Sequence, residues 1–198
     1  MQPAALGFRV HSGWTSLVAI ALEKSQPLIL LRQRPHLVAT FSYAYRQPYH
    51  TAEKMTLDEA RTFLEQQRVE GRKLALQAIR AAQSEVAQQG YELARASLLL
   101  ASGRRLPELP KILASHSIIH TADGEFFREA MLHACKRIHL SVTTIKEREL
   151  LSTASSALRR KPAMLTKFLT TLGKPLGSPW TQDEKFATLA AWLVLKSR

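Results

Sequence analysis

The sequence has few of the features that mark secreted and membrane proteins. It contains one cysteine, Cys135, so it can form neither an intrachain disulfide nor a cysteine-based zinc site. No apolar run approaches the roughly 20 residues that a membrane helix needs. The N-terminus also lacks the continuous apolar segment of a secretory signal. These absences favour a cytoplasmic protein with no membrane partner.

Acidic residues are scarce in particular places. The 198 residues include 28 Lys and Arg against 16 Asp and Glu, which gives a formal net charge of +12 and a pI of about 10.3. Glu23 is the only acid before residue 53, and no acid lies between Glu149 and Asp183. Such a bias favours polyanionic partners, chiefly nucleic acid. A solvated basic surface that only maintains solubility would have the same charge.

Cations of the two acid-poor stretches are the predicted nucleic-acid contacts. Phosphate contacts by such cations supply much of the affinity of proteins for nucleic acid, and DNA is expected here more than RNA. Tyr43, Tyr45 and Tyr49 alternate with Arg46 and His50. This pattern suits stacking on exposed bases, and it suits an ordinary exposed hairpin as well. The predicted contacts are Arg32, Arg34, Arg46, Arg159, Arg160, Lys161 and Lys167.

The pattern of apolar runs predicts an α/β fold. Runs at 6–10, 17–22 and 28–31 are separated by short turns, which suits an antiparallel meander. The second and third runs are nearly continuous, so both strands should be covered on two faces. The predicted order is three strands, then helix, strand, helix, strand, helix, which implies a mixed sheet of about five strands with helices on both faces. The first strand should be central and parallel to strands near 93–101 and 142–146.

Local signals place the helices. Thr56-Leu57-Asp58-Glu59 is a capping box, so a long helix should occupy residues 56–89. Apolar residues at helical spacing predict a helix over 123–138. The last helix should begin near Thr181. Residues 39–56 are expected to form a hairpin or loop insertion in a single domain of residues 1–198.

This order of elements resembles the ribonuclease H-like fold, and within it the RuvC-type Holliday junction resolvases. His11-Ser12-Gly13 followed by residues 17–22 resembles the opening turn and second strand of those enzymes. Residues 124–195 resemble their C-terminal half, ending in "TQDEKFATLAAWLVL", which is similar to their acid-led Ala/Leu helix. The resemblance covers most of the chain, in pattern more than in identity. It implies nucleic acid as partner and Mg²⁺ or Mn²⁺ as cofactor of an active relative, and it leaves a homodimer open.

The resemblance also identifies what is missing. Those nucleases hold two magnesium ions with three or four converging carboxylates. His11 stands at the position of the first-strand carboxylate, and residues 98–103, at the end of the fourth strand, include no acid. Asp183 and Glu184 are retained, but a Thr-x-x-Glu sequence also explains them as a helix cap. Asp183 is the candidate metal ligand, and it should lie within a side chain's reach of His11.

Other side chains could replace the missing ligands. His120 is a candidate ligand or general base. Glu125 and Asp123 start the predicted 123–138 helix, where Asp123 could instead be an N-cap. Glu147 and Glu149 follow the fifth strand, where a solvated strand end is the simpler explanation. His11, His120 and Asp183 are expected to converge at the carboxyl ends of the central strands. The candidate catalytic residues are His11, His120, Glu125, Asp183 and Glu184.

Three specific functions are compatible with these observations, besides an interaction module of unknown role. The favoured one is a nucleic-acid-binding protein on a RuvC-like scaffold whose nuclease activity is lost or altered. The second is an active Mg²⁺- or Mn²⁺-dependent endonuclease with rearranged ligands. The third is a phosphate or nucleotide binder, because Ser12-Gly13-Trp14-Thr15-Ser16 is similar to the phosphate turn of actin-like proteins and sugar kinases. No Walker-type glycine loop accompanies it. Whether the protein is an enzyme is left undecided by the sequence.

Overall fold

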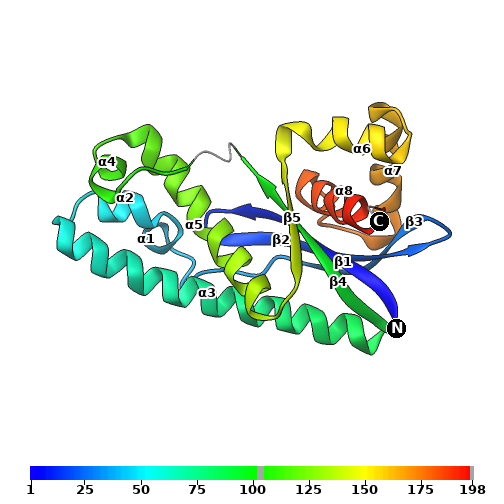
Figure 1. The fold of residues 1–198 in the computed structure, drawn as a ribbon, viewed down its shortest axis with the longest axis horizontal. Coiled ribbons are helices and arrows are strands. Elements are labelled where there is room, and N and C mark those ends of the chain that lie inside the picture. Colours follow the sequence, from blue (N-terminus) through cyan, green and yellow to red (C-terminus); the bar gives the residue numbers. More distant parts are fainter. Residues whose placement is uncertain (102–104, 197–198) are drawn as a thin grey trace.

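A mixed sheet runs through the computed structural model, which describes residues 1–101 and 105–196 (Figure 1). Its five strands lie in the order β3-β2-β1-β4-β5. Their bounds are β1 Gln2–His11, β2 Trp14–Glu23, β3 Gln26–Gln33, β4 Tyr91–Leu100 and β5 Ser141–Lys146.

The strand β1 is the middle strand of this sheet. It pairs antiparallel with β2 and parallel with β4, and β4 pairs parallel with β5. The prediction of a central first strand, parallel to the fourth and fifth, is therefore confirmed. Parallel neighbours need crossover connections. Here α3 (Leu57–Gln88) leads into β4, and α5 (His116–Arg137) leads into β5.

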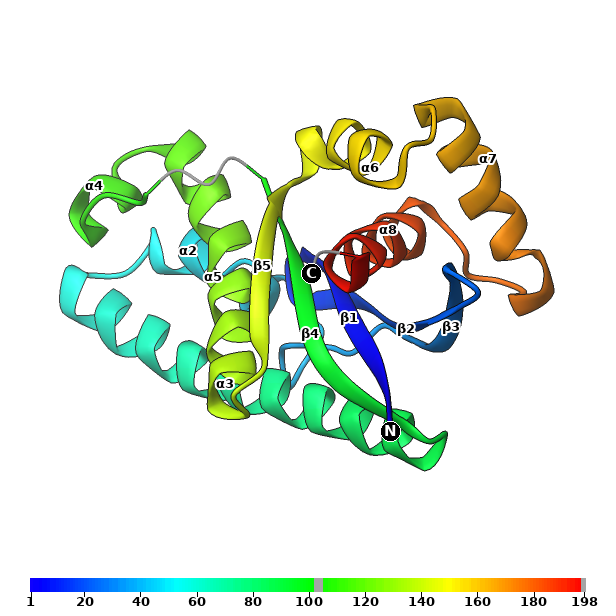
Figure 2. The same cartoon turned by 45° about the vertical axis from the view of Figure 1, so that its right-hand side comes forward.

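Helices cover both faces of the sheet, as predicted (Figure 2). Side chains of α3 and α5 form the core on one face. On the other face α8 (Gln182–Lys196) packs with α6 (Leu150–Leu158) and α7 (Pro162–Leu172). No described helix is both long enough and apolar enough to cross a membrane.

The third strand departs from the predicted pattern of burial. β2 is buried along nearly its whole length, as expected, but β3 is mostly half-buried. β3 is an edge strand, so no further strand covers its outer side. Continuous apolar sequence therefore did not mean complete burial at this position.

Residues 39–56, where a hairpin or loop was predicted, include two short helices. They contain α1 (Tyr43–Arg46) and α2 (Pro48–Ala52). α2 buries Tyr49 and His50, so Tyr49 is not available to stack on a base. The long helix predicted over residues 56–89 is confirmed as α3, with the capping box formed. The remaining elements are α4 Leu109–Leu113, η1 Glu147–Glu149 and η2 Lys174–Leu176.

The packing of α8 on β1 fixes the position of the candidate site. A Cβ atom added at Gly7 would lie 1.9 Å from the backbone oxygen of Ala187, so α8 rests directly on this glycine. Side chains alternate between the two faces of a strand. Arg9 and His11 therefore lie on the α8 face, beyond Gly7 toward the end of β1. One helical turn before Ala187, Asp183 points toward the same place.

Candidate functional site

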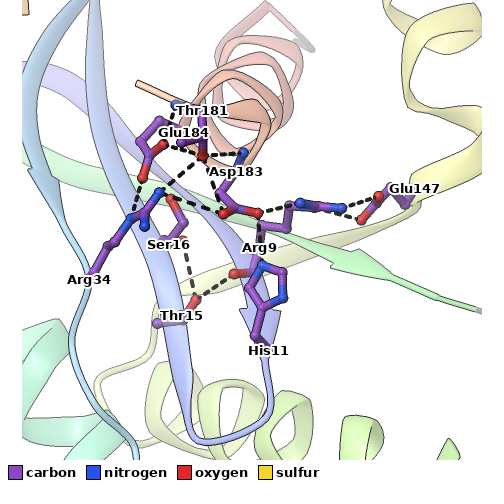
Figure 3. A network of polar contacts seen from close by, with 9 residues as sticks. All are labelled: Arg9, His11, Thr15, Ser16, Arg34, Glu147, Thr181, Asp183 and Glu184. Atoms are coloured by element: carbon purple, nitrogen blue, oxygen red, sulfur yellow. Dashed lines mark hydrogen bonds and ion pairs between the residues drawn. The ribbon is translucent and has the colours of Figure 1, made fainter. Parts of the chain in front are cut away.

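A network of charged side chains joins the ends of three strands to the first turn of α8 (Figure 3). β1, β3 and β5 run in the same direction, so their carboxyl ends meet at one edge of the sheet. Such edges commonly carry the sites of α/β proteins. The charged members of the network are Arg9, His11, Arg34, Glu147, Asp183 and Glu184.

Arg9 is the centre of the network. Its Nε donates to Glu147 Oε2 at 2.9 Å and its Nη2 donates to Oε1 at 2.6 Å, the two-pronged geometry of a strong ion pair. Its Nη1 donates to Oδ1 of Asp183. The hydrogen bonds to Glu147 raise the pKa of Arg9, with help from Asp183 and against the effect of burial. One permanent cation therefore joins two carboxylates that come from different elements.

Asp183 also contacts His11, as the sequence predicted. His11 Nε2 lies 2.8 Å from Asp183 Oδ1, and the imidazole stacks on Trp14 with ring centroids 4.4 Å apart. Burial raises the pKa of Asp183, but hydrogen bonds with His11 and Arg9 outweigh it and hold that pKa below its ordinary value. The carboxylate is thus stabilised in its charged form by protein groups alone.

Glu184 acts as a helix cap and as an ion-pair partner. Thr181 donates its backbone N–H to Glu184 Oε2 at 2.7 Å, and Asp183 donates its N–H to the Thr181 hydroxyl at 3.2 Å. Arg34 Nε donates to Glu184 Oε1 at 2.6 Å. Burial raises the pKa of Glu184, and the bonds from Arg34 and Thr181 outweigh it, so the net shift is downward. The capping explanation of this acidic pair is therefore correct for Glu184, while Asp183 extends into the network.

The network does not fit a pair of magnesium ions. Such sites need several carboxylate oxygens that converge on the cations. Here both oxygens of Glu147 accept from Arg9, Asp183 accepts from Arg9 and His11, and Glu184 accepts from Arg34. The guanidinium of Arg9 lies between Glu147 and Asp183 and donates to both. Arginine thus supplies the positive charge that these acids need.

Two of the predicted catalytic residues lie outside this network, on α5. Glu125 accepts a hydrogen bond from Arg128 Nη1 at 2.9 Å. The ring of His120 contacts His50 and His116 instead of His11 or Asp183. The prediction that His120 converges with His11 and Asp183 is therefore wrong. The first turns of α5, which carry His120, pack against α2.

The predicted nucleic-acid contacts form two groups at opposite ends of the sheet. Arg34 belongs to the network, and Arg46 lies near it, where its Nε donates to the backbone oxygen of Ser12 at 3.3 Å. Arg160 Nη2 donates to Gln26 Oε1 at 3.1 Å, at the β2–β3 turn. Arg32 instead donates to three backbone oxygens of the segment before α8. In the part of the chain that the structure describes, no ion pair involves the exposed side chains Arg159, Lys161 and Lys167.

Aromatic side chains surround the cations near the network, and sequence reasoning missed several of them. The Arg46 guanidinium lies 4.4 Å from the ring centroid of Phe41, and His36 stacks on the same ring at 4.2 Å. Arg34 lies 5.1 Å from the Trp14 ring. Phe41 is 44% exposed and Tyr43 is 63% exposed. The mixture of aromatic and basic residues over 34–46 could have indicated that these rings and cations pack together.

Comparisons with known proteins support the fold. No family model and no curated protein matches the chain. Among solved structures, T. thermophilus RuvC in complex with a Holliday junction substrate is 10% identical, with a TM-score of 0.53, and the match covers 98% of this chain and 94% of that one. A second Thermus thermophilus RuvC structure is also 10% identical, with a TM-score of 0.51, and the match covers 98% of this chain and 93% of that one. At such low identity, the structural match establishes the fold alone: the chain has a ribonuclease H-like fold of the RuvC type.

Proposed function

We propose that this protein binds nucleic acid on a RuvC-type scaffold and has lost cleavage by paired metal ions at the end of β1. The observation that carries the proposal is the Arg9 guanidinium between Glu147 and Asp183. For a metal to bind between these carboxylates, Arg9 would have to leave, and both acids would lose the hydrogen bonds that Arg9 donates. The net charge of +12 supports a polyanionic partner. The similarity to T. thermophilus RuvC, which was solved in complex with a Holliday junction substrate, supports the same kind of partner.

The primary contact surface in this proposal is the group of aromatic and basic side chains beside the network. Arg46 would contact phosphate, while the exposed rings of Tyr43 and Tyr45 would stack on unpaired bases. Arg34 is committed to Glu184, so its contribution to binding is expected to be smaller. Unpaired or branched nucleic acid offers the free bases that such rings need.

A second contact surface in the proposal consists of Arg159, Lys161 and Lys167. All three side chains are exposed in the region between α6 and α7 or on α7 itself. A nucleic acid that contacts both surfaces must extend across the sheet. Arg32 is excluded from this set, because its guanidinium holds the segment before α8.

The alternative of a phosphate-binding turn gains no support. Thr15 and Ser16 are fully buried. The Thr15 hydroxyl lies 3.2 Å from the backbone oxygen of Arg9, to which it donates. Hydroxyls that point into the protein cannot surround a phosphate.

A gel-shift series on four-way junction, duplex and single-stranded DNA across a range of salt concentrations tests the proposal. Affinity should fall as salt rises, with a slope of about −0.9 in log K against log salt for each phosphate neutralised on duplex DNA. Arg46→Gln and the pair Lys161→Gln with Lys167→Gln should each flatten this slope. Arg80→Gln is the matched control, because Arg80 is an exposed cation on α3, outside both surfaces. No binding at about 50 mM salt, or an equal effect of the control, would refute the proposal.

A further inference from the structure

Three histidines gather at a second place, apart from the charged network. His50 belongs to α2, and His116 and His120 belong to the first turns of α5. One ring nitrogen from each lies within 4.8 Å of the other two. His116 and His120 are four residues apart on one helix, so they project from the same face. Their Nε2 atoms are 3.1 Å apart.

A buried carboxylate orients the histidine of α2. His50 Nδ1 lies 2.5 Å from Oδ2 of Asp123, which is only 2% exposed. Asp123 Oδ1 also accepts the backbone N–H of Tyr49 at 2.7 Å, so the carboxylate is held at both oxygens. A hydrogen on Nδ1 leaves Nε2 with its lone pair free to bind a ligand. Metal-binding histidines are commonly oriented by carboxylates in this way.

We propose that His50, His116 and His120 bind one divalent metal ion of the zinc class, with Asp123 orienting His50 from behind. Histidine is a preferred ligand for these ions, and three histidines leave a fourth position for water. Zn–N bonds of about 2.0–2.1 Å in a tetrahedron place ligand nitrogens about 3.3 Å apart. The 3.1 Å separation on α5 is close to that value. Both α5 imidazoles are exposed and can rotate toward His50.

The structural consequence of such a site is a link between α2 and α5. α2 directly follows α1, which contains the exposed Tyr43 and Tyr45. The ring of Tyr43 lies 6.4 Å from that of His50. A bound metal would therefore hold the segment that carries the aromatic side chains against the body of the protein. The metal site itself does not depend on the proposed binding of nucleic acid.

Zinc titration of the full chain, without a histidine tag and after treatment with a chelator, tests this site. Calorimetry should give one Zn²⁺ per chain, and the melting temperature should rise by several degrees when zinc is in excess. His116→Ala and His120→Ala should each weaken zinc binding at least tenfold. Because both side chains are exposed, each variant should melt like the wild type when zinc is absent.

Two further variants complete the test. His139→Asn removes an exposed imidazole at a position with φ of 57°, which Asn tolerates, and should leave zinc binding unchanged. Asp123→Asn should weaken binding by about 10–100-fold, the usual effect of losing an orienting carboxylate. Absence of zinc binding at micromolar concentrations would overturn the proposal. Unchanged stoichiometry and affinity in both α5 variants would overturn it as well.

Discussion

Replacement of Arg9 by Met tests whether this arginine supplies the cation that its neighbouring carboxylates need. Methionine keeps most of the aliphatic length but removes all three charged hydrogen bonds. The side chains are 20% exposed for Arg9, 33% for Glu147 and 15% for Asp183. Breaking a fully buried ion pair costs about 3–5 kcal/mol, whereas an exposed pair is worth less than about 1 kcal/mol. The intermediate exposure predicts a loss of about 2 kcal/mol in the free energy of unfolding.

Thermal unfolding followed by circular dichroism measures this loss. For a chain of this length, about 2 kcal/mol corresponds to a fall in melting temperature of about 4–8 °C. The variant should also gain a response to Mn²⁺, because Glu147 and Asp183 then lack the guanidinium that lies between them. Mn²⁺ should raise its melting temperature and leave that of the wild type unchanged.

Arg72→Met is the matched control for this experiment. Arg72 also forms a two-pronged pair, with Glu129, through bonds of 3.2 and 2.5 Å. Its loss should destabilise the protein without creating a response to Mn²⁺. A wild-type melting temperature in Arg9→Met, or an equal Mn²⁺ response in wild type and variant, would refute the reasoning.

Two further predictions concern the packing of α8 and the response to acid. Gly7→Ala should destabilise the protein by at least about 1–3 kcal/mol, because its Cβ would lie 1.9 Å from the backbone oxygen of Ala187. In a denaturant titration of both variants, Gly71→Ala should instead be neutral or stabilising, since the nearest atom is 3.5 Å away and alanine favours a helix. The pKa values of Asp183 and Glu184 are lowered in the folded protein, so their contribution to stability is present above about pH 5 and is lost as the pH falls through the lowered values. Below about pH 4, the denaturant midpoint should therefore fall more steeply with falling pH in wild type than in Asp183→Asn. Parallel curves of midpoint against pH would contradict the lowered pKa of Asp183.

Much of the fold could be predicted from sequence because its signals are local. The Thr56 capping box begins the predicted long helix, and the apolar runs fall on strands β1 and β2. Residues 39–56 were misjudged, since α1 and α2 are short and neither has a side-chain cap that the sequence could reveal. Asp123 was taken as a candidate N-cap because the apolar stripe begins there, yet α5 begins at His116 and buries this acid.

The candidate site was predicted in part. The resemblance to RuvC-type enzymes predicted that His11 and Asp183 lie close together, and the two side chains are in contact. Arg9 was missed as a member of the site, although an arginine inside an apolar strand needs a buried partner. Its partner Glu147 lies 138 residues away in the sequence. No local pattern encodes such a pairing, which depends on the register of β1 and the path of the chain after β5.

Incubation of the protein with a labelled four-way junction in Mg²⁺ or Mn²⁺ tests the central claim most directly. Bound and cut DNA are measured in the same samples, for wild type and for Asp183→Asn. The account predicts a salt-sensitive complex with wild-type protein and no accumulation of cut product with either protein. Metal-dependent cutting by the wild type that disappears in Asp183→Asn would contradict it.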